Sequence, residues 1–342
     1  MNKYDEKYEI RLANENDIDS IMTFIDEHWK KNHILAVDRE LFKYEYLEEK
    51  GRVNFILAID KKKGTIEAIN GVIKASHDTE HLDVWDTLWK SLDGNMAFLG
   101  VELLKREPEL LGCRTNNGVG DNPETTIPLM KLMKSYTSKM THFYMLSNKE
   151  KYMIAKIDYR PKLVIEKDNS YKVKEYVNID EVKSVFNVLE NVDCVPYKDY
   201  WYINHRYYEH PYYKYNVYGI EKNERAEAIF VLRMQEYNGR MAARIVDYIG
   251  NQKAIVGAGS FFSELLGKED IEYIDFYCNG FQSDILHKVG FSQIMDKDKN
   301  IIPNYFEPFV QENIEIYVSS SSTNAFFTKA DSDQDRPNKI II

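Results

Sequence analysis

Apolar residues along the chain follow one pattern in the first half and repeat it in the second. Period-two alternation predicts short strands, and apolar positions at helical spacing predict amphipathic helices between them. In the first half the expected strands cover 8–12, 54–59, 66–74, 84–89, the segment around Cys113 and 142–146, with helices near 18–25, 101–104 and from Pro123.

The second half returns to the same order of elements. Segment 174–182 repeats the strand, polar turn and helix start of segment 11–21, and one strand in each half ends in Asn-Gly, at Asn117 and Asn279. The later strands are expected at 171–176, 213–220, 228–235, 242–248 and 271–277, with helices at 259–266 and around Ile285.

A repeat of roughly 160 residues has the size of a domain rather than of a solenoid unit. The sequence therefore predicts an α/β (α+β) fold of two tandem domains, 1–162 and 163–342, joined by a linker near Arg160-Pro161. The cleft between them is the first place to look for a site. For the end of the chain two interpretations stay open: a hairpin of 314–318 with 325–328, or a flexible tail.

Net charge and composition limit the classes of ligand that the protein is expected to bind. The 342 residues carry a formal net charge of −10, which speaks against a nucleic-acid backbone as the main ligand. Three scattered cysteines, Cys113, Cys194 and Cys278, give neither a disulfide framework nor a zinc site. No apolar signal core or membrane-length apolar stretch occurs. We expect a soluble cytoplasmic protein that binds no metal, membrane or nucleic acid.

One segment late in the chain carries the most specific motif. A strand ends at Asn279, a short helix with Ile285 and Leu286 follows, and Gly290-Phe291 closes the segment. With the repeated element order, this resembles the GNAT (Gcn5-related N-acetyltransferase) superfamily. An ordinary strand-helix-strand unit with a glycine C-cap would give the same pattern. The resemblance implies two tandem GNAT-like domains, each with a mixed central sheet flanked by helices.

GNAT proteins bind acyl-CoA where the fourth strand separates from the fifth, with the pyrophosphate on a helix N-terminus. The matching loops here are 95–104 and 252–259, and each departs from the family pattern at a glycine. We favour CoA binding in the first domain, because Gly100 has the family's spacing to the leucines that follow it, Leu103 and Leu104. The motif at Asn279 favours CoA binding in the second domain instead. The implied CoA-binding residues are Trp89, Lys90, Ser91, Leu92, Asn95, Ala97, Phe98, Leu99 and Gly100.

Two aromatic, histidine-bearing segments lie where GNAT folds shape the acceptor pocket. We expect them to face one cleft and to hold a sugar by stacking and a diphosphate by Arg206 or Arg336. The candidate acceptor-binding residues are His28, Trp29, Tyr46, His205, Arg206, Asp247, Asn304, Glu307 and Arg336. They can equally be core aromatics and surface histidines.

Over most of its length the chain resembles tandem-GNAT sugar-nucleotide N-acyltransferases of bacterial O-antigen and capsule synthesis. That resemblance implies acyl transfer from acyl-CoA to the amine of a dideoxy amino sugar on a nucleoside diphosphate, such as a dTDP-linked 3-amino-3,6-dideoxyhexose. His33 is the expected general base, with Asp247 and Asp275 as alternatives if the domains exchange roles. Backbone N–H groups around Trp89–Leu92 are expected to bind the oxyanion. Other possibilities are an aminoacyl-transferring relative acting on peptidoglycan precursors and a non-catalytic module.

Overall fold

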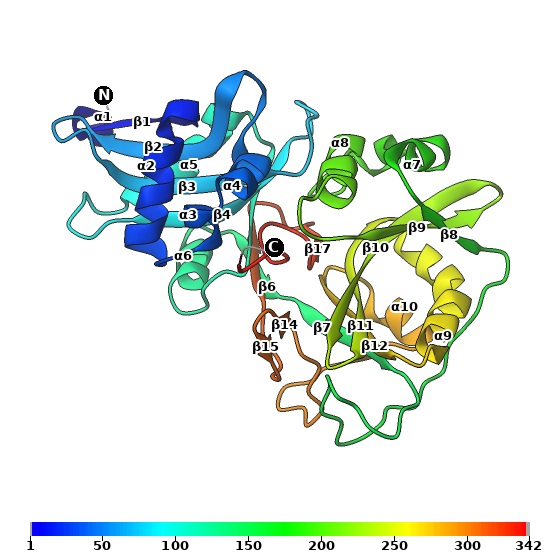
Figure 1. The fold of residues 1–342 in the computed structure, drawn as a ribbon. Coiled ribbons are helices and arrows are strands. Elements are labelled where there is room, and N and C mark those ends of the chain that lie inside the picture. Colours follow the sequence, from blue (N-terminus) through cyan, green and yellow to red (C-terminus); the bar gives the residue numbers. More distant parts are fainter. Residues whose placement is uncertain (1, 340–342) are drawn as a thin grey trace.

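Two mixed β-sheets, each flanked by helices, lie side by side in the computed structural model, which describes residues 2–339 (Figure 1). The first sheet has seven strands in the order β1-β2-β3-β4-β5-β16-β6. They are β1 (Tyr8–Asn14), β2 (Arg52–Asp60), β3 (Ile66–Lys74), β4 (Asp83–Ser91), β5 (Thr115–Val119), β16 (Tyr317–Ser320) and β6 (Tyr136–Lys139).

The second sheet repeats that order. It runs β8-β9-β10-β11-β12-β7-β13, and in each sheet only the fourth and fifth strands of this order pair in parallel among the described residues. Its strands are β8 (Lys172–Tyr176), β9 (Asn216–Lys222), β10 (Arg225–Tyr237), β11 (Arg240–Gly250), β12 (Ile271–Asn279), β7 (Thr141–Leu146) and β13 (Ser292–Gln293). The prediction of two tandem domains with mixed sheets is confirmed.

Each half of the chain gives one strand to the sheet of the other half. Strand β7 pairs with β12 from Tyr273↔Leu146 to Cys278↔Thr141, and β16 lies between β5 and β6. We expected segment 142–146 to be the last strand of the first sheet. It lies instead between β12 and β13 of the second sheet. The boundary at residue 162 stays a prediction, and the sheets exchange strands across it.

Local sequence explains the start of the helices and the tight turns. Asn14 and Asp17 form a capping box that leads into α2, and Asn178 caps α7. Asn238 and Gly239, both with positive φ, make the two-residue turn between β10 and β11. The helices are α1 (Lys3–Lys7), α2 (Ile18–Phe24), α3 (Ile34–Val37), α4 (Arg39–Tyr46), α5 (Leu99–Leu111), α6 (Thr126–Leu132), α7 (Ile179–Val185), α8 (Tyr200–Ile203), α9 (Gly259–Gly267) and α10 (Ser283–Lys288).

Helices α2 and α8 occupy matching places and both continue as π-helical turns. These turns are Ile25–Trp29 and Asn204–Tyr208. Isolated π-helical turns within helices often occur at functional sites. The two aromatic segments of the sequence therefore share a local geometry.

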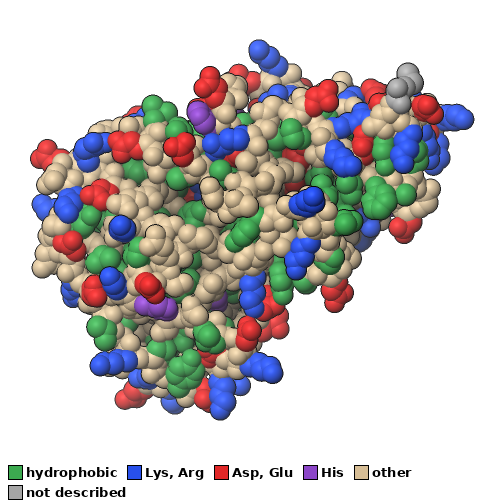
Figure 2. Space-filling view, turned by 180° about the vertical axis from the view of Figure 1, so that it is seen from behind, with side chains coloured by type: hydrophobic (Ala, Val, Ile, Leu, Met, Phe, Trp, Pro, Cys, Tyr) green, Lys and Arg blue, Asp and Glu red, His purple; other side chains and the backbone are tan. Residues whose placement is uncertain are grey.

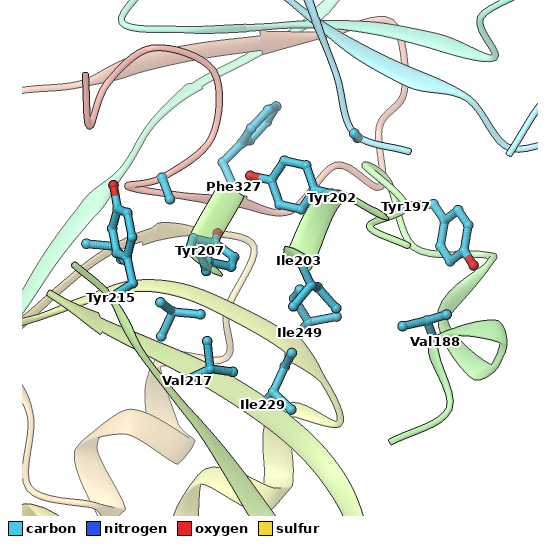
Figure 3. Close-up of a cluster of buried hydrophobic side chains, with 14 of the residues drawn as sticks. Val188, Tyr197, Tyr202, Ile203, Tyr207, Tyr215, Val217, Ile229, Ile249 and Phe327 are labelled. Atoms are coloured by element: carbon cyan, nitrogen blue, oxygen red, sulfur yellow. The ribbon is translucent and has the colours of Figure 1, made fainter. Parts of the chain in front are cut away.

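The C-terminal segment 314–338 lies between the two domains (red in Figure 1). It does not form the hairpin considered from the sequence, because β16 joins the first sheet and β17 (Phe327–Thr328) pairs with β12 of the second. Phe327 packs in one buried cluster with Tyr202 and Tyr207 (Figure 3). The short hairpin of β14 (Tyr305–Phe306) and β15 (Phe309–Val310) precedes this segment.

The strand exchange predicts that neither half folds alone. Residues 1–162 and 163–342, expressed separately, should each be insoluble or lack cooperative unfolding, because each sheet would lose an inner strand and expose a pairing edge. Expressed together, the two fragments should purify as a 1:1 complex on a tag carried by either one. Two fragments that are each monomeric and unfold cooperatively would contradict this.

Candidate functional site

A cavity of about 300 Å³ lies between the two domains. The first domain contributes α4 and the end of β3, and the second domain contributes α8 with its π-helical turn. Its walls include Tyr44, Glu48, Lys74, His77, Trp201 and His205. We call this the interdomain pocket.

Stacked rings form one wall of the interdomain pocket. His77 of the first domain lies 3.6 Å from Trp201 of the second, centroid to centroid, with the rings 12° apart. Trp201 stacks on His205 at 5.1 Å, and His205 stacks on Tyr44 at 4.2 Å. Offset stacking contributes about 0.5–1.5 kcal/mol per pair beyond area burial. This aromatic wall of four stacked rings spans both domains and borders the pocket.

Charged side chains also line the pocket. The Glu48 carboxylate accepts hydrogen bonds from Asn54 at 2.7 Å and Arg52 at 3.0 Å, and pairs with Lys74 at 2.8 Å. Burial by itself would raise the pKa of Glu48, but these donors outweigh it and lower the pKa to about 2. Glu48 is therefore a fixed negative charge at any physiological pH.

The expected acceptor residues do not share one cleft. His205, Arg206 and Arg336 line the interdomain pocket, whereas His33, Asn304, Glu307 and Arg336 line a second cavity of about 180 Å³. Arg336 borders both. The single-cleft prediction is wrong because the C-terminal segment runs between the domains and divides the space.

Both candidate arginines have internal partners. Arg206 donates to Tyr215 Oη at 3.2 Å and to two backbone carbonyl groups, and Arg336 donates to Glu45 at 2.6 Å and to Tyr46 Oη at 2.7 Å. A buried guanidinium must satisfy its N–H groups, and here the protein itself does so. The structure does not support a diphosphate contact at either residue in this arrangement.

Four more candidates lie outside both cavities. Asp247 is fully buried and pairs with Lys198 at 2.6 Å, so it neutralises a buried cation. Tyr46 is 1% exposed, while His28 and Trp29 lie on the outer side of their π-helical turn, with Trp29 43% exposed. Strand and helix periodicity identified these positions but not the direction each side chain takes.

His33 caps a helix. Its Nδ1 accepts the N–H of Leu35 at 3.3 Å, and burial lowers its pKa to about 4. The neutral ring therefore carries its proton on Nε2 and has no free lone pair. This bonding argues against the expectation that His33 is the general base.

Helix α5 begins without a side-chain cap, after Phe98 in the left-handed conformation at φ 63°. Ala97 and Phe98 are exposed. Helix-starting N–H groups without intrahelical partners form a natural anion site. Trp89 fixes the first turn by donating from its indole to the Gly100 carbonyl at 2.9 Å.

The rest of the expected CoA loop is held by the protein. The Asn95 side chain donates to Glu67 O at 3.0 Å, so it does not point freely at a ligand. The Leu92 N–H donates to the same carbonyl at 3.0 Å and is unavailable to an oxyanion. Lys90 and Ser91 pair with β3, and Leu99 is buried.

The parallel strands separate in both sheets. β4 pairs with β5 from Asp83 to Asp86 and then continues to Ser91 paired with β3 alone, and β11 leaves β12 after Ile245. In the second sheet the chain fills this gap: Thr328 pairs with Cys278 of β12, and the Ala330 N–H donates to Val246 O of β11 at 2.7 Å.

The helix start of the second domain is also covered. A Cβ placed on Gly257 would lie 2.4 Å from Tyr171, and one on Gly259 would lie 2.3 Å from the carbonyl oxygen of Glu166. These glycines let segment 166–171 pack directly on the loop. In the first domain, by contrast, a Cβ on Gly100 meets only the Trp89 side chain, at 3.1 Å.

Sequence reasoning missed His77, Glu48 and Lys74, which belong to no motif. His77 follows β3 in an irregular segment, and only the fold brings it onto Trp201. Among residues 2–339, no group of three or more His, Cys, Asp or Glu could hold a metal ion, and no helix is long and apolar enough to cross a membrane.

Solved structures resemble this architecture although no protein-family model and no curated protein matches the chain. A probable N-acyltransferase from Enterococcus faecalis aligns with a TM-score of 0.52 at 8% identity, over 92% of this chain and 71% of that one. A GCN5-related N-acetyltransferase from Anabaena variabilis aligns with a TM-score of 0.51 at 8% identity, over 92% and 72%. This chain has a GNAT fold. Strands β4 and β5 with helix α5 in the first domain correspond in topology to β11, β12 and α9 in the second.

Proposed function

We propose that the protein is an acyl-CoA-dependent N-acyltransferase whose first domain binds the acyl donor. The difference between the two strand gaps carries this proposal. Among the described residues no strand pairs with β4 on its β5 side past Asp86, and the start of helix α5 has no side-chain cap. In the second domain β17 and segment 166–171 fill the equivalent places. The second domain then serves to complete the acceptor pocket.

In this proposal the pyrophosphate of CoA lies at Ala97–Gly100 and the pantetheine arm follows β4 beyond Asp86. Along an antiparallel strand every second N–H points away from its partner, so β4 offers N–H groups toward the gap once β5 has left it. These groups can bind the pantetheine amides and the oxyanion that forms at the thioester. Leu92 is excluded from that role by its bond to Glu67.

The acceptor amine would enter through the interdomain pocket. This pocket reaches the gap at Ser332, whose hydroxyl donates to Asp86 O at 3.3 Å. The aromatic wall suits contact with a sugar or base. We propose a nucleotide-linked amino sugar, such as a dTDP-linked 3-amino-3,6-dideoxyhexose, as acceptor.

His77 is the better-placed base. Its Nε2 lies 3.8 Å from Glu48 Oε1, so this carboxylate stabilises the imidazolium that forms when His77 takes up a proton. The amine nitrogen forms a bond to the thioester carbon, its proton passes to His77, and the C–S bond breaks. CoA leaves as a thiolate that then takes up a proton.

A charge at the helix start tests the donor site. Ala97→Glu should raise the apparent KM for acetyl-CoA at least ~10-fold, because a carboxylate repels the pyrophosphate, whereas Ala97→Gln of the same size should raise it clearly less. Steady-state thiol release measures both. Equal KM values for the two variants would place the pyrophosphate elsewhere.

A thiol-release assay with dTDP-, UDP- and GDP-linked amino sugars tests the acceptor. We expect amine-dependent thiol release with at least one of them. Trp201→Ala should raise the acceptor KM ~10-fold or more while the acyl-CoA KM stays within about twofold, because Trp201 holds His77 and His205 in the wall of the acceptor pocket. An exposed aromatic residue, Trp29→Ala, is the control. No thiol release across the panel would reject the sugar-nucleotide acceptor. If the protein still binds CoA in that case, the proposed donor site is retained.

The two histidines give separable outcomes. His77→Ala should lower kcat by ~10²-fold with partial recovery at higher pH, where more of the amine is neutral. His33→Asn keeps a side-chain oxygen for the Leu35 N–H and should leave kcat within about twofold. The reverse result would restore His33 as the base.

A further inference from the structure

The second cavity, of about 180 Å³, has a charged lining and shares Arg336 with the interdomain pocket. Side chains of β10, β11, the β14 loop and the C-terminal segment line it, among them Arg233, Arg244, Asn304 and Lys329. All four are at most 7% exposed. We call it the cationic chamber.

Three of its four cations are balanced by carboxylates. Arg233 pairs with Asp335 at 2.6 Å, Arg244 with Asp275 at 2.7 Å, and Arg336 with Glu45 at 2.6 Å. Buried ion pairs of this kind leave no net local charge. Each arginine therefore has a carboxylate partner, and Arg336 has a second one in Asp333 at 2.9 Å.

Lys329 is the fourth cation. Its Nζ donates to the Gln334 carbonyl at 2.8 Å, and no carboxylate oxygen of residues 2–339 lies within 4.0 Å of it. The amide nitrogen of Asn304, in the same chamber, is buried and has no hydrogen-bond partner in the described part of the chain. Asn304 Nδ2 lacks any partner, and Lys329 Nζ has only a neutral carbonyl group. A buried donor without a partner costs about 1–3 kcal/mol, so the two groups together point to a missing acceptor.

We propose that the cationic chamber binds the carboxylate of a small organic acid, which accepts hydrogen bonds from Lys329 Nζ and Asn304 Nδ2. Lys329 has no carboxylate partner among the described residues, so a single carboxylate is the smallest charge that can pair with it. Glu307 and Asp333, which also line the chamber, would repel a dianion such as phosphate. Binding here requires no acyl transfer, so it can succeed or fail independently of the proposed enzyme activity.

The pKa of Lys329 agrees with this proposal. Burial and the nearby Arg244 and Arg233 lower the pKa of Lys329 to about 7, against the opposing effect of Asp335 and Asp275. A bound carboxylate would stabilise the ammonium form and raise the pKa again. Affinity should therefore fall as pH rises above about 7, because the free lysine loses its proton there.

Titration calorimetry and thermal shift on the full chain test the proposal with propionate, propionamide and inorganic phosphate as probes. We expect propionate to bind and to raise the melting temperature, the uncharged amide of the same shape to have no effect, and phosphate to bind at least 10-fold more weakly. The propionate Kd should rise between pH 7 and pH 8. No binding of propionate, or equal binding of the amide, would overturn the proposal, and stronger binding of phosphate would reject the carboxylate class.

Two variants locate the site. Asn304→Asp keeps the oxygen that accepts from Arg244 and replaces only the free N–H₂, and Lys329→Met removes the cation. Each should weaken propionate binding at least 10-fold, whereas Lys299→Met, at an exposed lysine, should not. If a chamber variant does not fold, a crystal structure of the native chain with propionate decides: density anywhere but between Lys329 and Asn304 would contradict the assignment.

Discussion

The exchange of β7 and β16 between the two sheets is the constraint on which the rest of the structure depends. Each sheet is completed by a strand from the other half, so the domains cannot separate without breaking six ladder positions along β12 alone. This fixes their relative position, and it is what brings His77 of one domain onto Trp201 of the other. A pocket built from two domains can then be as rigid as one built within a single domain.

The same exchange forces the C-terminal segment through the centre of the molecule. After β16 it must return across the interface, and there β17 fills the gap of the second sheet. Buried ion pairs hold the segment in place. Lys198 of the second domain lies 2.6 Å from both Asp247 and Asp331, and Asp331 belongs to the segment. Removing one partner of a buried pair typically costs about 3–5 kcal/mol, so this contact specifies where the segment lies. The repeat thus loses its symmetry at the point where a ligand would bind.

Much of the fold could be predicted from the sequence, because strand and helix periods are local properties. The capped helix starts at Asn14 and Asn178 and the order of elements followed from such signals. The sheet to which segment 142–146 belongs did not, since its alternation is satisfied equally well beside β5 or beside β12. The site was predicted least well. Arg206 and Asp247 carry the charges expected of binding residues, yet both are occupied by partners distant in sequence, and His77 has no local signal at all.

The acidic net charge conceals an uneven distribution. Acidic and basic side chains are interspersed over the face seen in Figure 2, so neither sign dominates there. Four cations, Arg233, Arg244, Lys329 and Arg336, line the cationic chamber. The three arginines pair with carboxylates, and Lys329 does not among the described residues. A neutral arginine costs more than a neutral lysine, because guanidinium scarcely loses its proton. Of these four side chains, Lys329 is therefore the one that can lose its proton near neutral pH. It is also the one that lacks a carboxylate partner among the described residues.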